Sequence, residues 1–243
     1  MKKKALVIVI ICFLLLGVLA NTGWGKEHIL YPSQAKRNAT QYIREKYGIK
    51  AKVKSLEIFV KDNSGSPILS LNIKKPLKEA WVIMEYEGKE FEVNIAWGDE
   101  KEQFDNYQQD VIARAVKEEF TEMIGEPAHI NVNSGLSSKF FDGNNLVEVL
   151  ETSLHGTNTA YVFVVDADLS DLTYDKMTQV FGENFKGHIL NCKDMEGVDK
   201  MVELETDYFI SKKDIEIYSP YLIEVYEFSG YLPDGVKYIE INE

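Results

Sequence analysis

The sequence predicts an α+β protein in which an antiparallel sheet packs against helices and a second, mixed α/β half follows. Three observations support this fold class. Short alternating runs rich in β-branched and aromatic residues are typical of strands, two stretches with helical periodicity flank them, and the second half mixes continuous apolar runs with helical patterns. With 243 residues, 45% of them hydrophobic, the chain is long enough for one large domain or two small ones.

The amino terminus, MKKKALVIVIICFLLLGVLA, has the pattern of an export signal. Three lysines precede an apolar run over residues 5–20, and Val18-Leu19-Ala20 matches a small-residue cleavage site. The run of about 16 residues is shorter than the roughly 20 that span a bilayer, which favours cleavage after Ala20. Retention of residues 5–20 as a membrane anchor is the alternative, and Trp24 would then suit the membrane interface. We expect an exported protein, extracellular or on the outer face of the cell membrane.

The net charge of the chain limits the classes of partner that it is expected to bind. Removal of residues 1–20 takes three lysines and no acid from the 27 basic and 39 acidic residues, which leaves a net charge of −15. So acidic a protein is not expected to bind nucleic acid or anionic lipid, and no basic stripe offsets this charge, but it can meet cationic partners or divalent ions. Cys192 is then the one cysteine that remains, because Cys12 lies in the apolar run, so no internal disulfide is expected.

Residues 27–125 are expected to form a first α+β module in the order helix, four strands, helix. Ser33 is a candidate N-cap for a helix that ends at Tyr47, before Gly48. Strands are expected over residues 50–61 and 68–75, separated by a turn at residues 62–67.

A hairpin over residues 81–97 supplies the other two strands of this module. A turn at Gly88-Lys89 would pair Tyr86 with Phe91 and Met84 with Val93, which places the apolar side chains on one face. The second helix would follow Asp105 as its cap and run to Ile124, before Gly125 and Pro127.

The layout of residues 33–124 resembles small exported proteins of Gram-positive bacteria built on a PepSY-like or cystatin-like α+β module. The resemblance rests on the helix ending QYIREKYG, the strands after it, and the hairpin that runs into FDNYQQDVIARAV. The hairpin lacks the Asp-x-x-x-Gly turn of the PepSY pattern, and a long helix follows it. The resemblance implies a non-catalytic module at the cell envelope, inhibitory or partner-binding, and transfers no functional residues.

Residues 126–243 are expected to form the second domain or half. Helices are expected near residues 144–154, 172–181 and 194–204, and strands at 161–167, 188–192, 214–218, 221–228 and 236–241. The boundary between the halves is placed near residues 125–135.

Four glutamates in the hairpin are the first candidate site. Glu85, Glu87, Glu90 and Glu92 would share the face opposite Tyr86 and Phe91. Like charges across a hairpin are destabilising, and a Ca²⁺ ion would offset them. A flat strand face converges poorly on an ion, so pairing with Lys50, Lys52 and Lys54 is the favoured interpretation.

The remaining candidates lack complete patterns. DADLSD (residues 166–171) begins like a calcium loop, but Asp171 occupies the glycine position and Met177 the glutamate position, so a helix cap at Ser170 or Asp171 is favoured. His188 and Cys192 would lie about 13 Å apart on a strand, too far for a catalytic pair. On a helix they could touch, but the pair would still lack a third group to orient the histidine. The other histidines, His28, His129 and His155, form no metal-binding motif.

These patterns predict no catalytic, cofactor or metal site. The favoured hypothesis is a non-catalytic, envelope-associated protein that binds a protein or wall component. An exported hydrolase whose site assembles only in three dimensions is the alternative.

Overall fold

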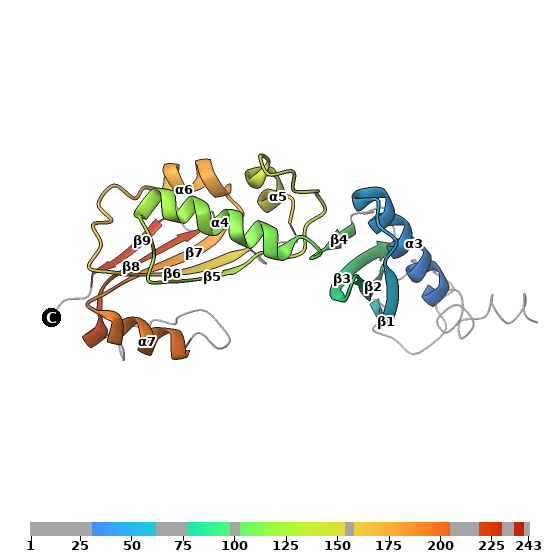
Figure 1. Cartoon of the computed structure of the whole chain (residues 1–243), viewed down its shortest axis with the longest axis horizontal. Helices are drawn as coiled ribbons and strands as arrows, with labels where there is room; N and C mark the ends of the chain where they lie inside the picture. Colours follow the sequence, from blue (N-terminus) through green and yellow to red (C-terminus); the bar gives the residue numbers. More distant parts are fainter. Residues whose placement is uncertain are drawn as a thin grey trace, which may run out of the picture. The chain divides into compact units, whose positions relative to one another are not determined.

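The computed structural model describes residues 31–61, 77–97, 103–153, 158–204, 219–229 and 236–240. The chain separates into two compact units, residues 1–105 and 106–243 (Figure 1). The first holds an antiparallel four-stranded sheet with a helix, and the second a mixed five-stranded sheet with helices. The predicted α+β class is therefore confirmed.

The first unit has two layers. Its sheet has the order β1 (Lys52–Lys61), β2 (Leu77–Tyr86), β3 (Lys89–Trp97) and β4 (Gln103–Asp105). Helix α3 (Tyr31–Tyr47) buries Ala35, Ala39 and Ile43, and Gly48 ends it with a φ of +71° and an N–H that donates to the Arg44 carbonyl. The buried side of the sheet carries alternate residues of β2 and β3: Ala80, Val82, Met84, Phe91, Val93 and Ile95.

The hairpin register differs from the expected one by two residues. Met84 pairs with Phe91 and Glu85 with Glu90, because the two-residue turn is Glu87-Gly88. Both turn residues have positive φ, +51° and +83°, which is the type I′ geometry that matches the twist of the strands and favours glycine at its second position. A shift of two keeps every side chain on its face, since strands repeat every two residues, so the predicted apolar face is correct.

Three other expectations for this unit change. Ser33 lies inside α3 rather than at its N-cap, and Asp105 belongs to β4, a strand that the sequence analysis missed. The strand expected at residues 68–75 and the turn at 62–67 lie outside the described residues.

The second unit is built on the sheet β5 (His129–Asn133), β6 (Thr159–Val165), β7 (Lys186–Cys192), β8 (Leu222–Ser229) and β9 (Val236–Glu240), in that order. Strands β6 and β7 run parallel and the other neighbours antiparallel. Figure 1 shows α4 (Gln109–Ile124) and α6 (Tyr174–Phe181) on one side of this sheet and α7 (Met195–Leu204) on the other. The short α5 (Leu146–Glu151) and the 3₁₀ turn η2 (Ser219–Tyr221) complete the unit.

Helix α4 belongs to the second unit, which corrects the expected boundary at residue 125. Its apolar stripe of Ile112, Val116 and Phe120 joins a core that includes Val149, Val162, Phe181 and Phe228. Phe120 stacks on Phe181 with ring centroids 4.7 Å apart. Its position in the chain predicts that this stripe covers the first sheet, but periodicity alone does not say which core a helix covers.

The sheet has a second, smaller core on its α7 side. Phe163, Leu190, Cys192, Val198, Met201, Leu222 and Val225 form it. The helices and strands expected around residues 144–204 and 221–241 are present with boundaries shifted by one or a few residues, whereas β5 was not expected and residues 214–218 lie outside the described part.

Candidate functional site

The glutamate face of the hairpin is paired with a lysine. Lys54 Nζ lies 2.7 Å from Glu85 Oε2 and 3.7 Å from Glu90 Oε1. A register shift between Val53 and Ser55 marks a β-bulge at Lys54, which directs this side chain to the glutamates. The hydrogen bond and the charge of Lys54 lower the pKa of Glu85. The favoured lysine pairing is thus confirmed for Lys54, while Glu87 lies in the turn, away from this pair.

The calcium-like stretch is organised by an asparagine. Asn191, 2% exposed, donates to the Ala167 carbonyl (2.8 Å) and to Glu224 Oε1 (2.9 Å), and accepts from the Ala167 N–H (3.1 Å). Asp168 Oδ1 accepts from the Ser170 N–H, and the cap of α6 is Thr173 instead of the expected Ser170 or Asp171. Across the described residues, no group of three His, Cys, Asp or Glu side chains is placed to hold a metal ion.

His188 and Cys192 both lie on β7, as expected for a strand. Cys192 is fully buried, and this burial raises the pKa of its thiol to about 12, so the sulfur keeps its proton at neutral pH. The His188 ring stacks on Tyr161 with centroids 5.1 Å apart. His129 packs against Phe163, while His28 and His155 lie outside the described residues. A protonated, buried thiol is a core side chain and not a nucleophile.

A buried ion pair in the first unit was missed by the sequence analysis. Lys46 Nζ lies 2.7 Å from Asp105 Oδ2, with side chains 7% and 0% exposed. The hydroxyls of Tyr42 and Tyr47 donate to the two oxygens of the same carboxylate at 2.9 and 2.7 Å. Burial lowers the pKa of Lys46, against the effect of Asp105, and burial together with Asp105 raises the pKa of Tyr42 far above its usual range.

This cluster fixes the helix to the sheet. Tyr42 and Lys46 are four residues apart on α3, and Asp105 ends β4, so the cluster joins two segments almost 60 residues apart in the chain. The signal in the sequence was a lysine next to the apolar stripe of α3. Its partner was not identifiable, because Asp105 had been interpreted as a helix cap.

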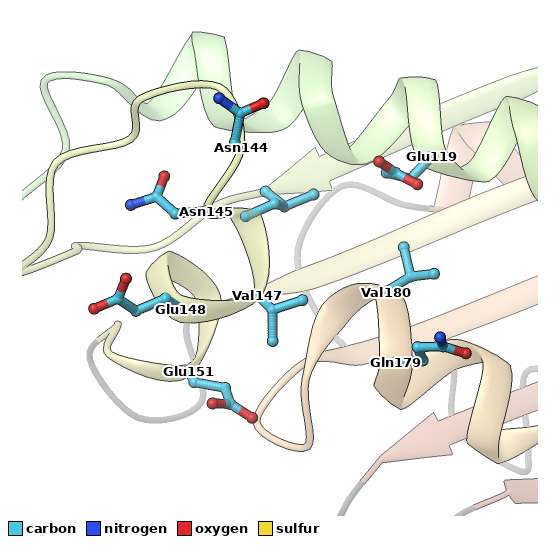
Figure 2. A pocket seen from close by; sticks show the side chains of 9 residues that line it. Glu119, Asn144, Asn145, Val147, Glu148, Glu151, Gln179 and Val180 are labelled. Atoms are coloured by element: carbon cyan, nitrogen blue, oxygen red, sulfur yellow. The ribbon is translucent and has the colours of Figure 1, made fainter.

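The second unit has an open groove lined by described residues. Its volume is about 810 Å³, and α4, α5, α6 and the loop before α5 surround it. Carboxylates, amides and apolar side chains line it: Glu119, Asn144, Asn145, Leu146, Val147, Glu148, Glu151, Gln179 and Val180. Figure 2 shows these side chains around the space between the three helices.

Side-chain hydrogen bonds to the backbone hold the walls of the groove in place. Asn145 accepts from the Asp142 N–H and donates to the Phe140 carbonyl, which fixes the loop before α5. Asn184, after α6, donates to the Glu151 carbonyl at the end of α5. Glu148 pairs with Lys139 at 2.9 Å. The three carboxylates of the lining therefore stand on a scaffold whose positions the fold sets, and no basic residue is among the nine that line it.

The acidic groups of the groove lining are the carboxylates of Glu119, Glu148 and Glu151. Its described lining contains neither a histidine nor a serine, threonine or cysteine nucleophile. Its chemistry is that of a surface that accepts hydrogen bonds and attracts positive charge.

None of the helices in the described part of the chain is long and apolar enough to span a membrane.

Comparison with known proteins gives no relative. No family model, no curated protein and no solved structure matches this chain. The resemblance of residues 33–124 to exported Gram-positive proteins stays a prediction.

Proposed function

We propose that this chain is a non-catalytic, exported, envelope-associated protein that binds a protein or wall component through the groove between α4, α5 and α6. The observation that carries the proposal is the lining of that groove, which presents three carboxylates and three amides beside apolar residues. The export pattern of residues 1–20 supports the location.

The charge of the groove specifies the partner's chemistry. Glu119 and Glu151 come from different helices and give the groove a negative potential, whereas the charge of Glu148 is paired with Lys139. The apolar side chains of Val147 and Val180 lie between them and suit the aliphatic stem of a lysine or arginine (Figure 2). A partner that presents a basic side chain or an amine therefore fits best.

A charge reversal in the groove tests this function. Three proteins are used to capture binding partners from the native envelope fraction: the wild-type full chain, the groove variant Glu119→Lys/Glu151→Lys, and a control variant. The control, Glu118→Lys/Glu122→Lys, makes the same charge change on the exposed side of α4. We expect the wild type and the control to recover the same partner and the groove variant to lose it. Equal recovery by all three proteins would refute the groove as the binding site.

The same material tests the hydrolase alternative. Wild-type chain that releases soluble fragments from purified cell wall would replace binding with catalysis. The buried, protonated Cys192 argues against a thiol nucleophile in the part of the chain that the structure describes.

A further inference from the structure

The first unit has two outer surfaces that differ in charge. On the helix layer, α3 exposes Lys36, Arg37 and Arg44. Glu45 is the acidic residue among them, and it accepts a hydrogen bond from Gln41 Nε2 at 2.8 Å. These residues and Thr40 line a shallow depression of about 540 Å³. This outward basic surface differs from the expectation that so acidic a chain, with a net charge of −12, carries no basic stripe for anionic lipid.

The sheet layer carries the hairpin glutamates, of which Glu85 and Glu90 are paired with Lys54. Ala35, Ala39 and Ile43 pack inward against the apolar side of the sheet, so Glu85, Glu90 and Glu92 lie on the side away from α3. The thickness of a helix, about 10 Å, already exceeds the Debye length of about 8 Å at physiological ionic strength. A surface that approaches α3 therefore meets positive charge, while the glutamates behind the sheet are screened.

We propose that the exposed face of α3 docks onto an anionic lipid surface and orients the first unit with its helix toward the membrane. Charge complementarity is the first argument. Chain continuity is the second argument, and it applies to the chain that retains residues 5–20 as an anchor: α3 begins at Tyr31, about ten residues after this run, and ten residues reach at most about 36 Å. The helix therefore lies within reach of any membrane that this run enters.

The expected strength follows from the number of basic residues. Each lysine or arginine near an anionic bilayer contributes about a fivefold gain in partitioning, so three contribute about 100-fold. The acidic charge of the rest of the chain opposes this only where it lies within a Debye length of the lipid.

Vesicle flotation with the full chain tests the proposal. Three proteins are compared on phosphatidylglycerol-containing and on pure phosphatidylcholine vesicles. They are the wild type, the α3 variant Lys36→Glu/Arg37→Glu/Arg44→Glu, and a control in the second unit, Arg114→Glu/Lys117→Glu/Lys176→Glu. The ratio of the two partition coefficients removes the contribution of the apolar run, which is the same in all three proteins. Both variants change the net charge by the same amount.

We expect the ratio of the two partition coefficients to fall about 100-fold in the α3 variant and to stay unchanged in the control. In the wild type, 1 M NaCl should abolish the preference for anionic vesicles. A neutral variant, Lys36→Gln/Arg37→Gln/Arg44→Gln, should also lose it, which guards against a folding defect of the charge reversal. If the α3 variant and the control lose the preference equally, net charge alone sets the affinity for anionic vesicles, and the proposal is overturned. Wild-type preference for a single-stranded oligonucleotide over the anionic vesicles would overturn it as well.

Discussion

Substitution of Asp105 by asparagine isolates the contribution of the buried ion pair. The change keeps the shape of the side chain but removes the negative charge that faces Lys46, whose side chain is only 7% exposed. An uncompensated buried charge costs about 3–5 kcal/mol, and the hydroxyls of Tyr42 and Tyr47 also lose a charged acceptor. Since single domains are stable by about 5–15 kcal/mol, we expect the first unit to lose a large share of its stability.

Tryptophan fluorescence during urea unfolding measures this loss selectively. All three tryptophans, Trp24, Trp81 and Trp97, lie within residues 1–105, so the signal reports the first unit. The double variant Lys46→Met/Asp105→Asn serves as the control, because it also removes the uncompensated charge of Lys46 and keeps an amide oxygen that can accept from a tyrosine hydroxyl. A loss below about 1 kcal/mol for Asp105→Asn, or a double variant no more stable than the single one, would refute the reasoning.

Two further predictions concern the second unit. Replacing Gly187 with alanine places a Cβ 1.9 Å from Phe228 Cζ, so overpacking should lower its stability by about 1–3 kcal/mol in thermal unfolding, and adding Phe228→Leu should recover part of that loss. If Gly187→Ala melts at the same temperature as the wild type, the predicted overpacking against Phe228 is wrong. Because the folded pKa of Cys192 is raised to about 12, its stabilising contribution is complete below the ordinary thiol pKa and is lost as the pH rises from about 9 to 12. Urea unfolding followed by circular dichroism should show a shallower decline over this window for Cys192→Ala, and parallel declines in the two proteins would contradict the assignment.

The predicted elements were most accurate where the pattern is local. The hairpin face was correct because a period of two places Met84 and Phe91 on the same side whichever neighbouring turn is used. The turn itself was displaced by one residue, since the type I′ turn requires positive φ at two consecutive positions and glycine favours the second. Lys54 was correctly named as a counter-charge, but the bulge that directs it could not be foreseen.

The candidate sites depended more on long-range contacts. The groove collects residues from α4, α5 and α6, which span residues 109–181, and no short motif unites them. The Lys46–Asp105 pair joins residues 59 positions apart. Neither arrangement has a periodicity that a single sequence can reveal.

The sequence by itself determined the α+β class, the buried faces of the strands and the stripe of α4, because side-chain periodicity is a property of each element alone. Only the tertiary structure decided that α4 covers the second sheet, that Asp105 neutralises Lys46, and that the basic side of α3 and the glutamate side of the hairpin lie on opposite surfaces of one unit. The physical reason is that an apolar stripe requires burial but does not name its partner. The partner is set by which surfaces fit together once the whole chain has folded.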